Sequence, residues 1–396
     1  MPQPSFAPPA RRLPAGVWVL GLVSLLMDAS SELVHSLLPV FMATALGASV
    51  ATIGLLEGVA EATASFAKVF SGTLSDRLGR RKVLVVTGYG LAALTKPLFP
   101  LAPSVSWVFA ARFLDRIGKG IRGAPRDALV ADITSPAERG AAYGLRQALD
   151  SVGACLGPVL AVGLMVWLES DVRQVLWFAV WPAALAVTLL VVAVREPESR
   201  ATQRRVASPL TWSGLAALPR RYWHVVGLGA VFALARFSEA FLVLRASDVG
   251  LAAAQVPVVM IVMNVVYAGT AYPAGRVSDR MPARVLLALG LVVLVAADLA
   301  LAWARTPALV LAGAAGWGLH MALTQGLFSK LVAETASPET RGTAFGLYHL
   351  VSGVTLLAAS ALAGALWTAF GPAATFFTGA AFSAAAALGV VTYRRA

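Results

Sequence analysis

The chain has 396 residues, of which 58% are hydrophobic and only 13% are charged, and its 32 lysines and arginines outnumber 20 acidic residues to give a formal charge of +12. Soluble domains contain about 45–50% apolar and about 25% charged residues. This composition excludes an ordinary soluble enzyme, a disordered chain and a disulfide-rich secreted module. It indicates a polytopic membrane protein, because long uncharged apolar runs need lipid as their solvent.

Twelve apolar segments follow one another along the chain. Each is close to or longer than the ~20 residues that cross a bilayer as a helix. The runs are continuous and do not alternate with period two, which favours helices over a β-barrel. The sequence therefore predicts an all-α membrane protein with twelve transmembrane helices, at residues 16–45, 51–73, 83–102, 105–124, 140–167, 174–194, 224–246, 252–275, 284–303, 307–329, 342–368 and 372–392.

The basic residues indicate how these helices are oriented. We assign 23 of the 32 to loops on the side of the two termini, among them Lys119, Arg122, Arg126 and Arg139 to the loop after the fourth segment. The opposite side holds Arg173, Arg245 and Arg305. Because cytoplasmic loops are enriched in lysine and arginine, we expect a multi-pass protein of a bacterial-type inner membrane with both termini cytoplasmic. The basic excess is then a topology signal, and we expect no nucleic-acid partner.

An internal repeat divides the chain. Residues 130–145 recur at 332–347 with an offset of 202 residues, and Gly72, Asp76 and Arg77 recur with an offset of 203. Two matches at nearly one offset predict two six-helix halves in the same orientation, as in transporters built from parallel repeats. The expected organisation is a tail at 1–15, a bundle at 16–194, a polar linker at 195–223, a bundle at 224–392 and a tail at 393–396.

The turn between the second and third segments carries a glycine, an acid and a basic cluster at fixed spacing, formed by Gly72, Asp76, Arg77, Gly79, Arg80 and Arg81. It resembles the signature loop of the major facilitator superfamily, Gly-x-x-x-Asp-Arg-x-Gly-Arg-Arg. The resemblance spans the whole chain through the repeat and implies that the acid and the arginines hold the two halves together in one state. Asp76 is then expected near the start of the eleventh helix, where a helix N-terminus favours a carboxylate.

Two further motifs resemble the same superfamily. Arg112 matches the arginine of its fourth-helix motif Arg-x-x-Gln-Gly-x-Gly, which the family ties to proton coupling, but Asp115-Arg116 replaces Gln-Gly. The fifth helix resembles the motif of drug:proton antiporters through Gly144, Gly153, Gly157 and Pro158, although Ala161-Val162 replaces the closing Gly-Gly. Ordinary packing of small residues between helices is the alternative interpretation of these glycines.

After the residues assigned to loops are set apart, fourteen charged residues remain within the predicted spans. Each unpaired charge at the bilayer centre costs about 2.5–3.5 kcal/mol on insertion scales, so these groups must pair or face an aqueous cavity. We assign proton coupling and a central cavity to the first half, through Asp28, Glu32, Glu57, Glu61, Arg112, Asp115, Arg146 and Asp150. We assign a substrate surface to the nearly apolar second half, through Arg236, Glu239, Asn264, Asp298, His320 and Gln325.

Some pairings follow from spacing and others stay open. Arg116 and Arg146 are candidate structural partners of Asp115 and Asp150, and Arg236 and Glu239 can pair at i and i+3. A salt bridge between Asp28 and Arg112 is compatible with their depth.

The leading hypothesis is a proton-coupled secondary transporter that works by alternating access and exports a small organic molecule. Its expected partners are that solute, protons and the lipid bilayer; no cofactor is expected, and the protein is expected to be a monomer. The alternative is an exporter of a divalent metal or metal chelate, because Asp28, Glu32 and His35 offer oxygen and nitrogen ligands on one helix face. A non-transporting scaffold has no need of buried charges, and no nucleotide-binding loop or nucleophile arrangement indicates an enzyme.

Overall fold

The structure, a computed structural model, describes residues 13–78, 80–135, 139–194, 218–278, 281–335 and 341–392, and the regular structure within these ranges is helical. The helices are α1 (Ala15–Ala45), α2 (Val50–Leu78), α3 (Arg81–Thr95), the 3-10 helix η1 (Lys96–Leu98), α4 (Val105–Ile133), α5 (Arg139–Trp167), α6 (Val172–Trp177), α7 (Val180–Ala193), α9 (Arg220–Ala235), α10 (Ala240–Asp248), α11 (Val258–Ser278), α12 (Ala283–Ala302), α13 (Pro307–Thr335), α14 (Arg341–Phe370) and α15 (Pro372–Thr392).

The predicted fold class is confirmed. Each predicted segment is occupied by one helix or by a helix that is interrupted once. Within the described ranges, nine helices or joined pairs are long and apolar enough to cross a membrane. The long helix α4 is not one of the nine, because charged residues recur along it.

Three predicted helices are interrupted, two of them at prolines. Pro97 has no N–H and cannot continue the backbone ladder, so α3 gives way to η1. Pro182 likewise has no N–H to donate to the carbonyl of Phe178, and α6 stops at Trp177, just before Phe178. Between α9 and α10 the N–H of Ser238 donates to Ser360 Oγ of α14 at 3.1 Å, so a side chain satisfies the backbone group there.

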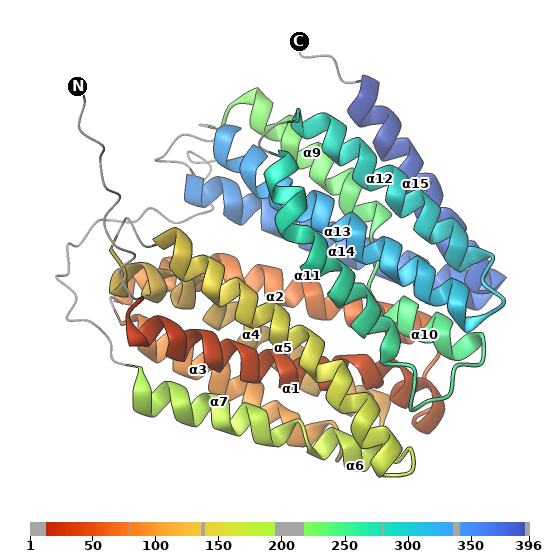
Figure 1. Cartoon of the computed structure of the whole chain (residues 1–396), viewed down its shortest axis with the longest axis horizontal. Helices are drawn as coiled ribbons and strands as arrows, with labels where there is room; N and C mark the ends of the chain where they lie inside the picture. The colour runs from red at the N-terminus through yellow and green to blue at the C-terminus, as the bar shows by residue number, and fades with distance from the viewer. Residues whose placement is uncertain are drawn as a thin grey trace, which may run out of the picture.

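Figure 1 shows the helices of the first half, α1–α7, gathered on one side of the molecule and those of the second half on the other. The halves meet most extensively where α2 packs along α14, and again where α5 meets α11 and α1 meets α10. Residues 195–217 of the predicted linker lie outside the described residues. The described chain resumes at Leu218, and α9 begins at Arg220, before the expected bundle boundary at 224.

Among the described residues, the apolar side chains of the two halves share one buried cluster, at one end of the molecule. One buried cluster contains Phe41 and Ile53 of the first half together with Phe241 and Trp317 of the second. At the opposite end, where α1 begins, the described residues form separate clusters. One belongs to the first half around Tyr89, and two belong to the second half. The space between the halves is therefore closed by packing at the end where α1 stops and α2 starts.

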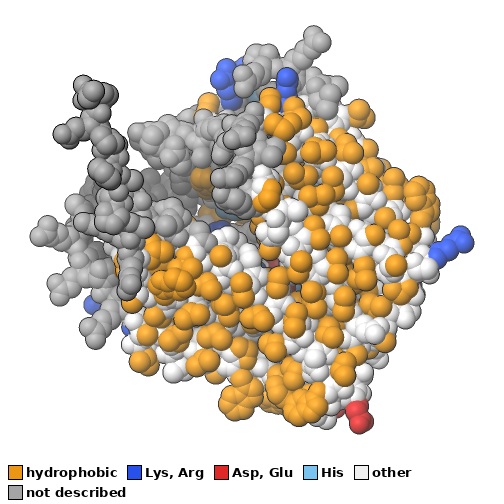
Figure 2. All heavy atoms as spheres, viewed as in Figure 1, with side chains coloured by type: hydrophobic (Ala, Val, Ile, Leu, Met, Phe, Trp, Pro, Cys, Tyr) orange, Lys and Arg blue, Asp and Glu red, His pale blue; other side chains and the backbone are white. Residues whose placement is uncertain are grey.

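The outer surface is apolar. Large side chains such as Trp181, Val192 and Phe370 are more than 70% exposed. Figure 2 shows hydrophobic side chains spread over the visible face, with charged groups at its edges. A surface this apolar is suited to lipid and unusual for water, since soluble proteins rarely expose large contiguous apolar areas.

Two arginines hold the loops at the closed end. Arg173 of α6 donates to the carbonyls of Pro100 and Ala102, both at 2.9 Å. Arg245 of α10 donates to the carbonyl of Leu301 at 3.0 Å and also to that of Ala304 at 2.6 Å. The two loops occupy equivalent places in the repeat, and in each one an arginine satisfies carbonyls that the helix end leaves without partners.

The contact between α2 and α14 depends on glycine. A Cβ at Gly54 would lie 2.5 Å from the carbonyl oxygen of Ser360 and 2.8 Å from the Phe241 ring. A Cβ at Gly364 would lie 2.8 Å from Ala51 Cα on the opposite helix. These distances are too short for a side chain unless the backbones separate, so the glycines set the spacing between the halves.

We expect Gly54→Ala to destabilise the protein by about 1–3 kcal/mol, because the new methyl group meets backbone and an aromatic ring. Gly90→Ala is the control: nothing lies within 4 Å of its added Cβ, and alanine favours the α3 helix. Thermal unfolding in detergent measures both. Equal melting temperatures for the two variants would contradict this account of the interface.

Candidate functional site

Helix α4 carries five basic residues on one face, which we call the α4 basic stripe: Arg112, Arg116, Lys119, Arg122 and Arg126. Their spacing of four, three, three and four residues keeps them on one side of a helix. The helix continues to Ile133 and does not end near 124, so the assignment of the last three residues to a cytoplasmic loop was wrong. The stripe runs into the interior of the molecule, where Arg112 and Arg116 are about 1–2% exposed.

The first two arginines of the stripe pair with acids on α2. Arg112 Nη2 lies 2.9 Å from Glu57 Oε2, and both side chains are 1% exposed. One turn further, Arg116 Nη1 lies 3.2 Å from Glu61 Oε1. The acids are four residues apart and so are the arginines, so two parallel helices bring both pairs into register. The structure does not form the Asp28–Arg112 salt bridge that the sequence allowed.

Asp115 stabilises the same region through two bases. Lys96 Nζ lies 2.9 Å from its Oδ1 and donates to Ser31 Oγ at 3.0 Å. Arg116 Nε lies 3.6 Å from its Oδ2, which bears out the expected pairing with Asp115. The Asp-Arg pair that replaces Gln-Gly in the motif therefore brings its own partners and leaves no isolated buried charge.

The far end of the stripe faces α1 and α5. Arg122 Nη2 lies 3.8 Å from Asp28 Oδ1, and its guanidinium stacks over the Tyr89 ring at 4.4 Å. Arg126 Nη2 lies 3.8 Å from Asp150 Oδ2. The same carboxylate oxygen accepts a hydrogen bond from Arg146 Nη1 at 2.6 Å, as the i, i+4 spacing predicted.

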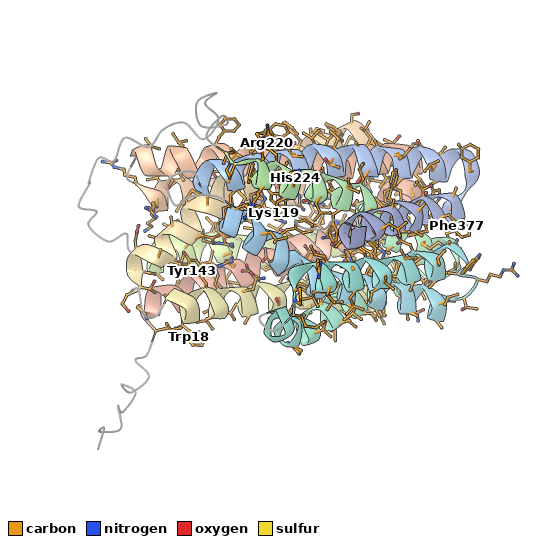
Figure 3. The ribbon with its side chains drawn as sticks, turned by 90° about the horizontal axis from the view of Figure 1, so that it is seen from above. Trp18, Lys119, Tyr143, Arg220, His224 and Phe377 are labelled. Carbon is orange, nitrogen blue, oxygen red and sulfur yellow. The ribbon has the colours of Figure 1, made fainter. Side chains whose placement is uncertain are left out.

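A cavity of about 390 Å³ lies beside this end of the stripe. Both halves line it, with α1, α2, α4 and α5 from the first and α11 and α14 from the second. The polar and charged residues on its wall are Asp28, Glu32, Ser65, Lys68, Lys119, Arg122, Arg126, Gln147, Asp150, Ser151, Asn264, Tyr267 and His349. Lys119 lies near the middle of the view in Figure 3, between the helices of the two halves.

The glycines of the fifth-helix motif pack α5 against the acids of α1. A Cβ at Gly153 would lie 2.5 Å from the Leu25 carbonyl oxygen and 3.1 Å from Asp28 Cβ. A Cβ at Gly157 would lie 2.7 Å from Glu32 Cβ. The motif thus gives close helix contact, as the packing interpretation expected, and that contact is directly behind two cavity acids. Pro158 lies inside the same helix.

Of the predicted second-half residues whose side chains the structure describes, only Asn264 lines this cavity. Its Nδ2 donates across the halves to the Ala154 carbonyl at 3.2 Å. Arg236 and Glu239 pair with each other at 3.8 Å. Asp298 is buried within the second half and accepts a hydrogen bond from Trp317 at 2.9 Å, and His320 bonds the Gly290 carbonyl at 2.8 Å.

The metal candidates are spread over separate interactions. His35 lies between two carboxylates, with Nδ1 3.4 Å from Glu32 and Nε2 3.6 Å from Glu57, while Asp28 faces Arg122. Within the ranges that the structure describes, no group of three His, Cys, Asp or Glu side chains could hold a metal ion.

The signature loop is partly described. A Cβ at Gly72 would lie 3.3 Å from Ala124 Cβ of α4, Arg80 is exposed, and Arg81 Nε lies 3.1 Å from Asp132 Oδ2. Gly79 lies outside the described residues, as do the side-chain environments of Asp76, Arg77, Gly144 and Gln325. The docking of Asp76 at the eleventh helix stays a prediction.

Several cavity residues escaped the sequence reasoning. The charge pattern assigns Lys119, Arg122 and Arg126 to a cytoplasmic loop, although the first two lie within the predicted span at 105–124. Their three- and four-residue spacing from Arg112 was the signal that the helix and its polar face continue. Tyr267 and His349 carry no comparable signal, because single aromatic or histidine residues in apolar helices are ordinary.

We expect Arg112→Met to destabilise the protein by about 3–5 kcal/mol, because it leaves the buried Glu57 carboxylate without its guanidinium. Adding Glu57→Gln should recover more than half of that loss, since no buried charge then stays unpaired. Chemical unfolding in detergent measures the cycle. The control is Arg81→Met, whose partly exposed pair with Asp132 should contribute about 0–1 kcal/mol. Strictly additive losses at positions 112 and 57 would contradict the coupling.

Known proteins resemble this chain in sequence and in fold. The sequence matches the profile of the Major Facilitator Superfamily over residues 20–332 and 225–396. It is 31% identical over 377 residues to an MFS-type transporter of Methanocaldococcus jannaschii. The aligned region covers 93% of this chain and 92% of that protein. It is also 31% identical to the multidrug resistance protein MdtH of Yersinia enterocolitica over 164 residues, 41% of this chain and 39% of that protein.

Solved structures share the fold at low identity. The nucleoside transporter NupG superposes with a TM-score of 0.80 at 13% identity, covering 95% of this chain and 99% of that one. A POT family transporter in complex with 5-aminolevulinic acid gives a TM-score of 0.78 at 12% identity, covering 96% of each chain. With the helical architecture, the family profile and a relative matched over nearly its full length, the chain belongs to the major facilitator superfamily of membrane transporters.

Proposed function

We propose that this transporter is a proton-coupled exporter of a small organic molecule. The observation that supports it best is the cavity between the halves, where three carboxylates from α1 and α5 face bases from α4. The side chains of Asp28, Glu32 and Asp150 are 26%, 20% and 16% exposed, so water and solutes can reach them. A carboxylate that can exchange an arginine partner for a proton or a solute is the chemistry that coupling needs.

Asp28 is our candidate for the proton carrier. Its ion pair with Arg122 is long at 3.8 Å, whereas Glu57 and Asp150 hold arginines at 2.9 and 2.6 Å. The neighbouring charges are Asp150 on α5 and Lys119, Arg122 and Arg126 on α4. Because the Coulomb attraction falls with distance, Asp28 loses less by leaving its arginine than Glu57 or Asp150 would, so a proton or a cation can replace that partner at a lower energetic cost.

Alternating access would act on the shared core. With both termini on the cytoplasmic side, the joined end of the bundle is the outer one, and the cavity lies on the cytoplasmic side of the Phe41–Phe241 region. Opening outward then requires the shared cluster to separate, while the first-half and second-half clusters at the other end come together. The partial similarity to MdtH, a multidrug resistance protein, supports export as the direction of transport.

We expect solute-dependent proton movement in proteoliposomes. Vesicles with an acidic interior and trapped pyranine should lose their pH gradient faster when a transported solute is added, with ethidium, ethanolamine and phosphoethanolamine as first probes. Asp28→Asn should abolish the solute-dependent rate, because asparagine has no carboxyl to carry the proton. Asp28→Glu should retain it, because glutamate keeps a carboxyl.

The matched control removes an acid outside the cavity. Asp171 caps α6 by accepting a hydrogen bond from the Gln174 N–H at 3.1 Å, and asparagine caps equally well, so Asp171→Asn should transport normally. Solute flux that ignores the pH gradient and persists in Asp28→Asn would refute proton coupling.

A further inference from the structure

The cavity is polarised in charge. Its acids, Asp28, Glu32 and Asp150, come from α1 and α5, which pack together. Its bases, Lys68, Lys119, Arg122 and Arg126, come from α2 and α4, which also pack together. The second half adds Asn264, Tyr267 and His349. The described wall therefore has an acidic side, a basic side and a weakly polar third side.

The basic side contains two lysines without acidic partners. Lys68 and Lys119 are exposed within the cavity, and in the part of the chain that the structure describes neither has a carboxylate within 4 Å. Every cavity acid has a base in reach: Glu32 has His35, Asp28 has Arg122 and Asp150 has Arg146. The cavity thus retains positive charge that its own acids do not neutralise.

The register of α2 explains why the partner is missing. Glu57 and Glu61 face Arg112 and Arg116, and the next position one turn along α2 is Ser65. A third acid there would have continued the series toward Lys119, but Ser65 and then Lys68 line the cavity instead. The series of ion pairs between α2 and α4 stops where the cavity begins, and Lys68 and Lys119 lie where a third pair of this series would have formed.

Glycines on α4 make room for this arrangement. A Cβ at Gly120 would lie 2.4 Å from Ala67 Cβ and 2.7 Å from the Ala64 carbonyl oxygen, so the glycine lets α2 and α4 touch beside Lys119. A Cβ at Gly123 would lie 3.8 Å from two carbons of the Lys68 stem, which lies across that bare position. Arg122, 4% exposed, adds a buried Nη1 that has no hydrogen-bond partner among the described residues.

We infer that the solute is amphoteric: its anionic group binds Lys68 and Lys119, and its cationic group binds the acids of α1. This inference rests on the proposed function and names its substrate class. Ammonium groups give an anion strong charge-assisted hydrogen bonds. The span between the two sides fits one small molecule, since the whole cavity is about 390 Å³. A cationic group that displaces the proton from Asp28 is also what exchange of solute for proton requires.

The test is binding to the purified full-length protein in detergent, with no pH gradient. Ethanolamine is the cationic probe and inorganic phosphate is the anionic probe. Phosphoethanolamine joins these two groups in one molecule and carries both charges. Thermal shift titrations at constant ionic strength should rank phosphoethanolamine as the tightest of the three. Lys68→Gln and Lys119→Gln should each weaken it roughly tenfold or more, because each removes a charged hydrogen-bond donor.

Two variants control for stability and for charge. Lys119→Arg should keep most of the affinity, because the positive donor stays in place. Lys82→Gln removes a lysine outside the cavity, whose Nζ donates to the Val191 carbonyl, and should leave phosphoethanolamine binding unchanged. Any of three results would overturn the inference. Ethanolamine could bind as tightly as phosphoethanolamine, phosphoethanolamine could bind equally well to both lysine variants, or no anion-bearing probe could shift the melting temperature. Failure of proton coupling alone would appear only in the proteoliposome assay and would leave these shifts intact.

Discussion

The pairing of α4 with its neighbours is the interaction on which the first half depends. A helix with so many charges cannot lie in an apolar interior unless each buried charge finds a partner, because isolated ions there are very costly. Glu57 and Glu61 on α2, Lys96 at the start of η1, and Asp28 and Asp150 on α1 and α5 supply or share those partners. Four separate elements are thereby fixed around one helix, and the cavity forms where the pairs between α2 and α4 end.

Much of the fold followed from the sequence, because lipid imposes simple rules. Continuous apolar runs predicted the segments in which the helices lie, and the duplicated segment predicted two halves in one orientation. The local pair of Arg146 with Asp150 followed from helix geometry, whereas Arg236 and Glu239 pair across the break between α9 and α10. What hydropathy could not give was the true length of α4, because a hydropathy average falls where charges begin even though the helix continues to Ile133.

The pairing of charged side chains on different helices could not be predicted from the sequence, for a different reason. Whether Arg112 meets Glu57 or Asp28 depends on the rotation and the register of three helices, and these are set by close contacts at glycines such as Gly120 and Gly153. The length of α4 also decides the charge of the cavity, because its wall carries more bases than acids once Lys119, Arg122 and Arg126 are counted with this helix.

The location of the ion pairs has an electrical consequence. The pairs along α4 join residues of the first half only, from Glu57–Arg112 to Asp150–Arg126. If that half rocks as one body, each pair travels as a neutral dipole and moves little net charge through the membrane field. One elementary charge crossing 100 mV is worth about 2.3 kcal/mol. In the proposed proton-coupled cycle, the voltage dependence would then come from the proton, the solute and the two cavity lysines, Lys68 and Lys119, which have no carboxylate within 4 Å among the described residues. A solute with balanced charges would leave the proton and those lysines as the main electrogenic species.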